Sequence, residues 1–417
     1  MGRSSSFRRR LHDISSGGSH GPTRRARSIA SLASLSLGGA VAASLLAAGS
    51  VAASVPTTRY VATNGNDANA CTWAAPCATI GHAVDVAAPG STISVAAGTY
   101  HEQVFVTKRL SLVGHGAVVD ASELLGGIPP LNGFGIIGTG ILVAGPGASG
   151  SSVRGFKVED APAEGILVAM TTHVSVVGNE VMHNDVGATT AFDPLPFECA
   201  AQGEVPGDCG EAIHLLSTAF SRAVDNNVHD NVGGFLLTDE VGPNHNNLIA
   251  NNISRDNKLD CGITLPSHNA DAVGNPSKGG VYGNVIIHNV SEGNGGAGVG
   301  MFAPFPGAAS YNNVVIGNTL RDNGEAGVAI HSHTPGQNVS GNVIVGNRIS
   351  GNGVDPDFID MTTHVGIMLG SVADRVNVTV SANWIANEDV GIYRVGPIHV
   401  NGLRSNRFAS SVAIRVH

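Results

Sequence analysis

Three side chains that can exchange protons or bind a metal recur at one position of a repeated strand pattern. Glu240, His268 and His333 each lie six residues after the glycine of a Gly-apolar-x-apolar segment. Stacked strands are about 4.8 Å apart, so these side chains should lie near one line. A carboxylate and two imidazoles on one face suit general acid–base catalysis or metal binding. The alternative is that they are polar strand ends that face water.

Other titratable residues are expected near the same line. His331 precedes His333 by two positions in a strand, so both side chains should point to the same side. Acidic residues in the segments between strands complete the set. We predict catalytic roles for Glu240, Asp239, His268, His333, His331 and Asp193, and substrate-binding roles for His214, Glu211, Asp260 and Glu198.

Acidic residues are concentrated in two of the long segments. Paired carboxylates can hydrolyse glycosidic bonds, and carboxylate oxygens can hold Ca²⁺, which is the one cofactor candidate. Either segment could instead be a solvated acidic loop. The first group is Asp185, Asp193, Glu198, Glu204, Asp208 and Glu211, and the second is Asp355, Asp357, Asp360 and His364.

The elements that would position these residues are short strands of a repeat marked by asparagines at five-residue spacing. A repeat of this length with short β-rich segments predicts a solenoid, in which each turn buries its apolar face only against the next turn. An Asn amide both donates and accepts, so a column of them can hydrogen-bond along the stack. The four sets are 247, 252 and 257; 284, 289 and 294; 313, 318 and 323; and 342, 347 and 352.

The Gly-apolar-x-apolar segments predict one strand in each coil. Strand alternation should point their second and fourth residues inward and the third outward. Arg394 breaks the inward rule, which indicates that the stack is ending there. The segments begin at Gly165, Ala212, Gly234, Gly262, Gly298, Gly327, Gly366 and Gly391.

Long insertions leave the coils near these segments, which favours this side of the solenoid as the functional face. The insertions are residues 185–210, 239–247, 266–280, 303–312 and 354–365.

Residues 1–53 are predicted to be a secretion signal. Basic residues precede an apolar, small-residue run from Ile29 to Ala48, which is the pattern of an exported protein. Thr23-Arg24-Arg25 gives only a partial twin-arginine motif, and an uncleaved membrane anchor is the alternative. The protein is therefore expected to be secreted, either released outside the cell or associated with the cell surface.

Residues 54–120 are expected to form an N-terminal cap and the first coils, and residues 121–417 the remaining coils with their loop insertions. Between Ala78 and Ala87 the apolar residues share one face, which predicts a short helix. Such a helix can cover the open end of a β-stack, whose edge would otherwise be unpaired.

The start of the chain resembles a known family. The run from Thr79-Ile80 through Pro89-Gly90-Ser91-Thr92-Ile93-Ser94-Val95 and Gly98-Thr99-Tyr100 to Leu110-Ser111-Leu112-Val113-Gly114 is similar to the opening coils of right-handed parallel β-helix proteins of the pectate-lyase-like superfamily. The resemblance covers roughly residues 59–410. It implies an all-β, right-handed parallel β-helix, but leaves the activity open, because this fold carries lyases, hydrolases, epimerases and non-enzymes.

Catalytic motifs of that superfamily are incomplete here. Gly114-His115-Gly116 lies in an early coil ahead of any acidic pair, so it is interpreted as a turn and not as the Gly-His-Gly of polygalacturonase-type enzymes. Phe192-Asp193-Pro194-Leu195 is similar to the Phe-Asp-Pro-His of mannuronan epimerases but lacks the histidine. The resemblance therefore carries over Asp193 alone.

Cysteines and charge bound the remaining possibilities. In an exported chain, Cys71 with Cys77 and Cys199 with Cys209 predict two local disulfides, and Cys261 is expected to be a buried free thiol. The formal net charge is −9, and without residues 1–53 there remain 16 Lys and Arg against 31 Asp and Glu. Such acidity disfavours nucleic acid as a partner.

We expect a monomer without a membrane partner once the signal is removed, and a polysaccharide as the partner. Two functions remain open. The first is a polysaccharide lyase, glycoside hydrolase or epimerase. The second is a non-catalytic glycan-binding or cell-surface protein, which would need exposed aromatic side chains in a shallow groove.

Overall fold

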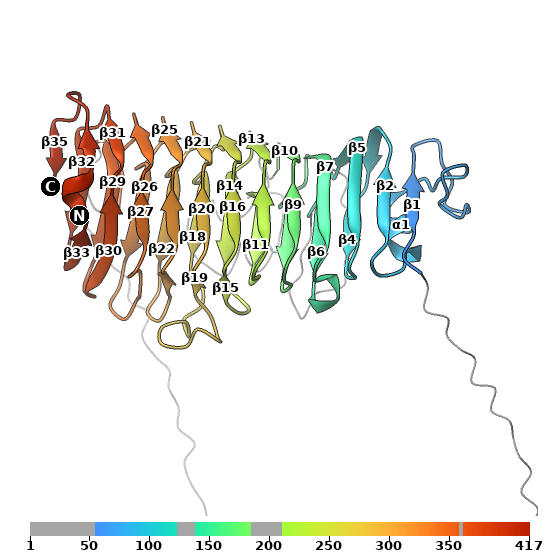
Figure 1. Cartoon of the computed structure of the whole chain (residues 1–417), viewed down its shortest axis with the longest axis horizontal. Coiled ribbons are helices and arrows are strands. Elements are labelled where there is room, and N and C mark those ends of the chain that lie inside the picture. Colours follow the sequence, from blue (N-terminus) through green and yellow to red (C-terminus); the bar gives the residue numbers. More distant parts are fainter. Residues whose placement is uncertain (1–54, 123–137, 185–210, 358–361) are drawn as a thin grey trace, which may run out of the picture. The chain divides into compact units, whose positions relative to one another are not determined.

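The described chain folds into a right-handed parallel β-helix, as predicted (Figure 1). The computed structural model describes residues 55–122, 138–184, 211–357 and 362–417, which belong to one compact unit, Ala53–His417. Every pair of strands in its three sheets is parallel, and the described residues contain one α-helix. Successive coils lie beside one another in chain order (Figure 1).

The 11-stranded sheet carries one strand per coil. All eight predicted Gly-apolar-x-apolar segments form strands of this sheet, in register with one another. The register is continuous from Ile213 through Phe235, Ile263 and Val299 to Val328. In chain order the strands are β4 (Val104–Val106), β6 (Ile141–Ala144), β8 (Ile166–Ala169), β11 (Glu211–Leu216), β14 (Gly233–Thr238), β18 (Ile263–Pro266), β22 (Val299–Ala303), β26 (Val328–Ser332), β29 (Val365–Ser371), β32 (Val390–Val395) and β35 (Ile414–Val416).

Strand alternation sorts the side chains of this sheet as expected. The second and fourth residues of the first seven segments, such as Ile263 and Leu265, belong to the main core. On the opposite side, residues such as Met368 and Ala329 form a second buried apolar cluster. Arg394 is exposed, and one further strand, β35, completes the stack after it.

The 21-stranded sheet forms the rest of each coil, and a three-stranded sheet lies beside it. The 21-stranded sheet contains β1 (Thr58–Val61), β2 (Thr92–Val95), β3 (Gly98–His101), β5 (Ser111–Asp120), β7 (Ser152–Glu159), β9 (Ser175–Val177), β10 (Glu180–Met182), β12 (Arg222–Val224), β13 (Asn227–His229), β16 (Leu248–Ala250), β17 (Ile253–Arg255), β20 (Val285–Ile287), β21 (Val290–Glu292), β24 (Val314–Ile316), β25 (Thr319–Arg321), β27 (Val343–Val345), β28 (Arg348–Ser350), β30 (Val376–Ser381), β31 (Trp384–Ala386), β33 (Ile398–Asn401) and β34 (Arg407–Phe408). The small sheet contains β15 (Asn244–His245), β19 (Val281–Tyr282) and β23 (Ser310–Tyr311).

Buried asparagines join the turns of adjacent coils. The Oδ1 atom of Asn318 accepts two hydrogen bonds, from the backbone N–H and the Nδ2 of Asn289, at 2.8 and 3.0 Å. Asn318 donates in the same way to Asn347. Its amide also donates to the carbonyl of Ile286. The pattern runs farther than the four predicted coils, from Asn179 through Asn226, Asn252, Asn289, Asn318, Asn347 and Asn383 to Asn406.

The predicted capping helix is α1 (Ile80–Val86). Thr79 caps its N-terminus, and the carboxylate of Glu102 accepts hydrogen bonds from the backbone of Ile80 and Gly81, both at 2.8 Å. The buried side chains of Ile80, Ala83 and Val84 belong to the main core, so the helix covers the first coil.

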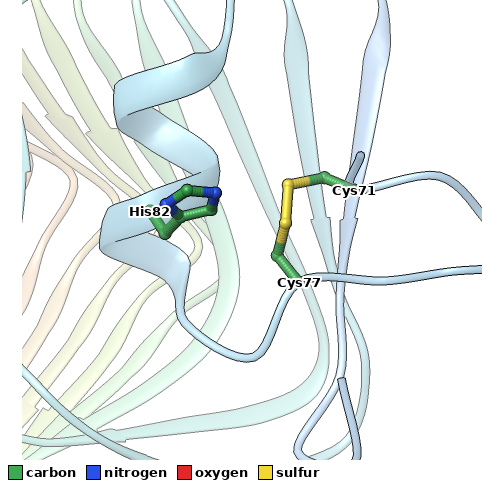
Figure 2. Close-up of side chains that lie close together, drawn as sticks. All are labelled: Cys71, Cys77 and His82. Carbon is green, nitrogen blue, oxygen red and sulfur yellow. A yellow bond between two sulfur atoms is a disulfide. The ribbon is translucent and has the colours of Figure 1, made fainter. Parts of the chain in front are cut away.

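The cysteines agree with the sequence expectation wherever they are described. Cys71 and Cys77 form a disulfide beside α1, with His82 of the helix close by (Figure 2). Cys261 is free and buried. Cys199 and Cys209 lie outside the described residues.

A substitution in the asparagine column should destabilise the whole stack. Asn318→Leu removes both the acceptor for Asn289 and the donor for Ile286, and leaves these buried groups unpaired. We expect a loss of about 1–3 kcal/mol in the free energy of unfolding, measured by urea and thermal denaturation. Asn377→Leu, at an exposed strand position, is the matched control. An unchanged melting temperature for Asn318→Leu would contradict the structural role of the column.

A second prediction concerns the acid that ends another asparagine column. Glu388 Oε1 accepts from the backbone N–H and the Nδ2 of Asn352. Burial, partly offset by these bonds, raises the pKa of Glu388 from 4.5 to about 7. Because the folded-state pKa is raised, the carboxyl favours folding below pH 4.5 and loses that contribution as the pH rises through 7.

Glu388→Gln keeps the acceptor and removes the buried charge. We expect its stability relative to the native chain to rise between pH 4.5 and 7 and then to level off at about 1–3 kcal/mol in its favour. Denaturant titrations at several pH values measure this difference. Glu180→Gln, at an exposed position on β10, controls for the loss of one negative charge, and a pH-independent difference for Glu388→Gln would refute the prediction.

Candidate functional site

A cleft of about 250 Å³ extends along the outward face of β18, β22 and β26, from residues that precede these strands to residues at their ends. Leu259, Pro266, Phe302 and Pro304 give it apolar walls. Strand pairing aligns Pro266 with Phe302 and Phe302 with His331, so the cleft crosses three coils of the 11-stranded sheet. Its titratable lining residues are Asp260, Cys261, His268, Glu325, His331, His333 and Asp357.

The structure thus brings to one place four of the residues that were assigned catalytic or substrate-binding roles from the sequence. His268, His331 and His333 line the cleft together with Asp260, which had been assigned to substrate binding. His331 lies on β26 and His333 follows that strand directly, so both point to the same side, as alternation requires.

His331 and His333 converge on one carboxylate. Asp357 Oδ2 lies 3.2 Å from Nδ1 of His331 and 3.0 Å from Nε2 of His333. On the other side of the buried His331 ring, Nε2 lies 2.8 Å from Oδ2 of the buried Asp355. That second contact has the distance of an ion pair, although its angle falls outside that of a regular hydrogen bond.

The protonation of this cluster follows from its charges. Burial alone would lower the pKa of His331, but the carboxylates of Asp355 and Asp357 outweigh it and raise the pKa to about 9. The hydrogen bonds from His331 and His333 hold the pKa of the Asp357 carboxyl well below its ordinary value. At neutral pH the cluster therefore contains an imidazolium between carboxylates.

Glu325 is the acidic lining residue that the sequence predictions omitted. Burial and then the nearby Asp355 carboxylate raise its pKa from 4.5 to about 7, and Asp260 contributes in the same direction. Asp260 and Glu325 each stand two residues before the glycine of a Gly-apolar-x-apolar segment. That shared register was the signal that could have identified Glu325.

Asp260 and Glu325 lie two coils apart in one column. The backbone N–H of Gly296 donates to the carbonyl of Asp260, and the N–H of Glu325 donates to the carbonyl of Gly296. Gly296 therefore occupies the intervening coil, and it places no side chain between the two carboxyl groups. Two coil spacings correspond to about 10 Å between the backbones.

The predicted Glu240–His268 pair is formed at the edge of the cleft. Glu240 Oε1 lies 2.7 Å from Nδ1 of His268, and both side chains are almost fully buried. Burial opposes the charged form of Glu240, but the hydrogen bond from His268 and its charge hold the pKa of Glu240 below the ordinary value. His268 lines the cleft, whereas Glu240 lies behind it and orients the ring.

Asp239 lies away from the cleft. Its oxygens accept hydrogen bonds from the hydroxyl of Ser267 and from the backbone N–H groups of His268 and Gly280. Burial and the neighbouring Glu240 raise its pKa to about 6. These contacts fasten both ends of the segment 267–280, so we revise its predicted catalytic role to one of positioning.

His214 and Glu211 belong to a separate buried group. His214 Nδ1 lies 2.9 Å from Glu164 Oε1, and its Nε2 lies 2.7 Å from the hydroxyl of Thr238. One ligand atom each of Glu164, Glu211 and His214 lies within 4.8 Å of the others. None of these three side chains lines the cleft. The candidates Asp193 and Glu198 lie outside the described residues.

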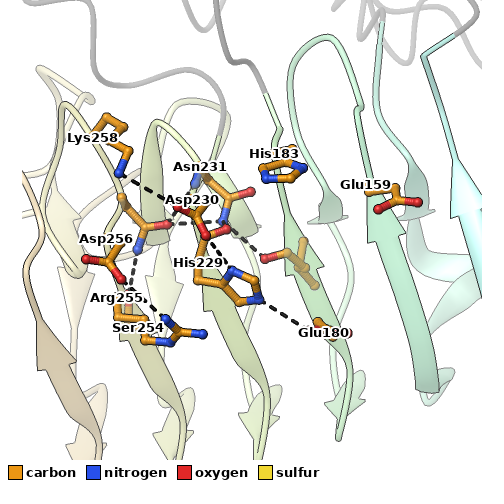
Figure 3. A network of polar contacts seen from close by, with 12 residues as sticks. Glu159, Glu180, His183, His229, Asp230, Asn231, Ser254, Arg255, Asp256 and Lys258 are labelled. Atoms are coloured by element: carbon orange, nitrogen blue, oxygen red, sulfur yellow. Dashed lines mark hydrogen bonds and ion pairs between the residues drawn. The ribbon is translucent and has the colours of Figure 1, made fainter.

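Another polar network lies on the 21-stranded sheet and is a weaker candidate (Figure 3). His229 contacts Asp230 at 2.8 Å and Glu180 at 3.3 Å, and Lys258 lies 3.7 Å from Asp230. Glu180 and Asp230 are 47% and 37% exposed, so these are surface ion pairs, which contribute little.

Comparisons with known proteins match a short stretch of the chain to one family. Residues 63–114 match the family described as "Protein of unknown function (DUF1565)". No curated protein sequence matches the chain. Among the described residues, no helix is long and apolar enough to cross a membrane.

Solved structures with similar folds include enzymes and binding proteins. An alginate lyase from Paenibacillus sp. str. FPU-7 is 12% identical, with a TM-score of 0.46, over 87% of this chain and 98% of that chain. PfbA, a surface adhesin of Streptococcus pneumoniae, is 14% identical, with a TM-score of 0.49, over 79% of this chain and 85% of that chain. A tailspike protein of E. coli bacteriophage HK620, in complex with a pentasaccharide, is 12% identical, with a TM-score of 0.46, over 78% of this chain and 52% of that chain. At such identities the likeness concerns the course of the chain and not the residues of the cleft.

Proposed function

We propose that this protein is a polysaccharide-active enzyme, and specifically a glycoside hydrolase that inverts the anomeric configuration. The observation that carries the proposal is the pair of carboxyl groups, Asp260 and Glu325, which line one cleft two coils apart. The secretion signal predicted in residues 1–53 would place such an enzyme where it meets extracellular polysaccharide.

The two-coil spacing of Asp260 and Glu325 favours inversion over retention. Inverting glycosidases hold their acid and base roughly 6.5–9.5 Å apart, which leaves space for a water, whereas retaining enzymes hold them roughly 5–5.5 Å apart. The backbones of Asp260 and Glu325 are two coil spacings, about 10 Å, apart, and on this spacing we assign the pair to the first class.

Glu325 is suited to be the general acid. Its pKa of about 7 leaves it largely protonated in mildly acidic solution, where an ordinary glutamate is ionised. Glu325 would donate its proton to the glycosidic oxygen as the bond to the anomeric carbon breaks. Asp260, as a carboxylate, would accept a proton from the water that attacks that carbon from the other side. The electron pair of the broken bond stays on the leaving oxygen, Asp260 then releases its proton to solvent, and Glu325 takes one up from solvent.

The charge of the cleft favours hydrolysis over β-elimination from a uronic acid. A lyase must neutralise the substrate carboxylate, and no Lys or Arg is found among the described lining residues. The imidazolium of His331 already lies between Asp355 and Asp357. We propose a neutral sugar, stacked on Phe302, as the substrate, and the uronate polymers in the assay below test the alternative of a cation-assisted lyase.

Substitution of the proposed acid tests the mechanism. Glu325→Gln keeps the size of the side chain and removes its proton, so we expect hydrolysis to fall by about 10²–10⁴-fold with an unchanged melting temperature. Reducing-end assays on β-glucan, xylan, polygalacturonate and alginate measure the rate, and NMR of the first product gives its anomeric configuration. Glu180→Gln is the control.

Two outcomes would overturn the proposal. Full activity of Glu325→Gln would remove the assigned acid. An unsaturated product from either uronate polymer would identify a lyase instead.

A second candidate function, glycan binding without catalysis, is supported by a row of rings on neighbouring coils. The centroids of successive rings lie 5.0–5.4 Å apart. Phe220 is 52% exposed and has a left-handed backbone, with φ of 53°. At the same position of the next two coils, Asn246 and Gly283 have this left-handed backbone. A phenylalanine in this conformation strains the backbone by about 1–3 kcal/mol, which Gly or Asn would largely avoid. The rings are His173, Phe220, His245, Tyr282 and Tyr311.

If this row binds glycan, Phe220→Ala should weaken the binding of the best polysaccharide of the panel by about 2–10-fold, because an aromatic contact contributes about 0.5–1.5 kcal/mol. Affinity electrophoresis measures the change. Val372→Ala removes a similarly exposed apolar side chain elsewhere and should leave binding unchanged. Equal affinity of Phe220→Ala and the native chain would exclude the row as a binding surface.

A further inference from the structure

We propose that His331, His333 and Asp357 form a binding site for a divalent transition-metal ion, with Zn²⁺ as its representative. One ligand atom from each of the three residues lies within 4.8 Å of the others, at the wall of the cleft. Two imidazole nitrogens and one carboxylate oxygen are the donors of many catalytic metal sites, which keep further positions open for water or substrate.

The backbone prepares this arrangement. His331 and His333 alternate along one strand and its extension, so their rings are on the same side, with centroids 5.5 Å apart. Asp357 comes from the segment after the next strand pair and faces both rings through one oxygen atom, Oδ2. A cation at this point would replace the contacts that now join each ring to that oxygen.

Asp355 supplies an independent observation that favours a metal. A metal-ligating histidine commonly gives its second ring N–H to a carboxylate, which fixes the tautomer and the ring orientation. In His331, Nε2 lies at an ion-pair distance of 2.8 Å from the buried Asp355 carboxylate, while Nδ1 faces Asp357 and the proposed site. Both side chains are at most 2% exposed, so the ring cannot easily turn away.

The donor set selects the class of ion. Imidazole suits Zn²⁺, Cu²⁺, Ni²⁺ and Fe²⁺. Ca²⁺ takes six to eight oxygen ligands, which these two histidines do not provide. The sequence prediction of Ca²⁺ therefore does not fit this cluster. The site opens to the cleft, since His333 is 31% and Asp357 49% exposed, so an ion can enter from solvent.

Metal binding is measured directly and does not rest on the proposed hydrolysis. The full chain is treated with a chelator, dialysed, and titrated with Co²⁺ as an optical probe and with Zn²⁺ by calorimetry. We expect one Co²⁺ equivalent with visible d–d absorption, which Zn²⁺ displaces and a large excess of Ca²⁺ does not.

Variants assign the site. His333→Ala and Asp357→Asn change partly exposed side chains, so both should fold, and both should abolish the Co²⁺ absorption. Asp355→Asn, which alters only the positioning carboxylate, should weaken Zn²⁺ binding by about 10–100-fold. His399→Ala, an exposed histidine on β33, is the matched control and should bind normally.

Each result decides the matter. Loss of the Co²⁺ signal in His333→Ala and Asp357→Asn, with retention in His399→Ala, supports the site. Retention of the signal in either ligand variant, or displacement by Ca²⁺, would overturn it. A native chain that binds no Co²⁺ would also overturn it, and would leave the test of Glu325 unaffected.

Discussion

The structure depends on the hydrogen bonds that buried asparagines make from one coil to the next. A solenoid must turn several times per coil, and each turn leaves backbone groups inside that no strand can pair. An asparagine at the turn accepts from the N–H and the amide of the previous coil and donates to a carbonyl below, as Asn318 does. Each buried group left unpaired would cost about 1–3 kcal/mol, so the columns fix the register between the successive coils that they join.

A fixed coil spacing also determines what a site on this fold can be. Side chains at one register position form a column, and distances along that column come in steps of about 4.8 Å. Asp260 and Glu325 are separated by two steps because Gly296 occupies the intervening coil. By contrast, His331 and His333 come from one coil and meet a third residue, Asp357, across a longer connection. We propose that the first pair flanks a substrate and a water and that the second group holds one ion.

Much of this arrangement could be predicted from the sequence, and the limits have a physical cause. Periodicity reports what every coil repeats, so the asparagine columns, the Gly-apolar-x-apolar strands and the shared face of His268 and His333 were visible. Glu325 was missed because acids occupy its column only in alternate coils, at Asp260, Glu325 and Asp389, and a search for what every coil repeats does not detect such a pattern. Burial, which raises the pKa of Glu325, depends on packing that a repeat does not encode. The partnership of His331 with Asp355 depends on an insertion whose course breaks the register.

Asp239 and Glu240 show why adjacent carboxylates can be misread. Both were predicted to act on a substrate, yet both contact His268. Asp239 accepts a hydrogen bond from its backbone N–H, and Glu240 contacts its imidazole ring. Asp239 also binds Ser267 and Gly280, so it closes the base of the segment between them. A buried carboxylate is costly, and its pKa of about 6 reflects that cost. The hydrogen bonds that Asp239 accepts offset this cost. They also replace the strand-to-strand hydrogen bonds that the segment 267–280 loses where it leaves the stack, and so they keep His268 in the wall of the cleft.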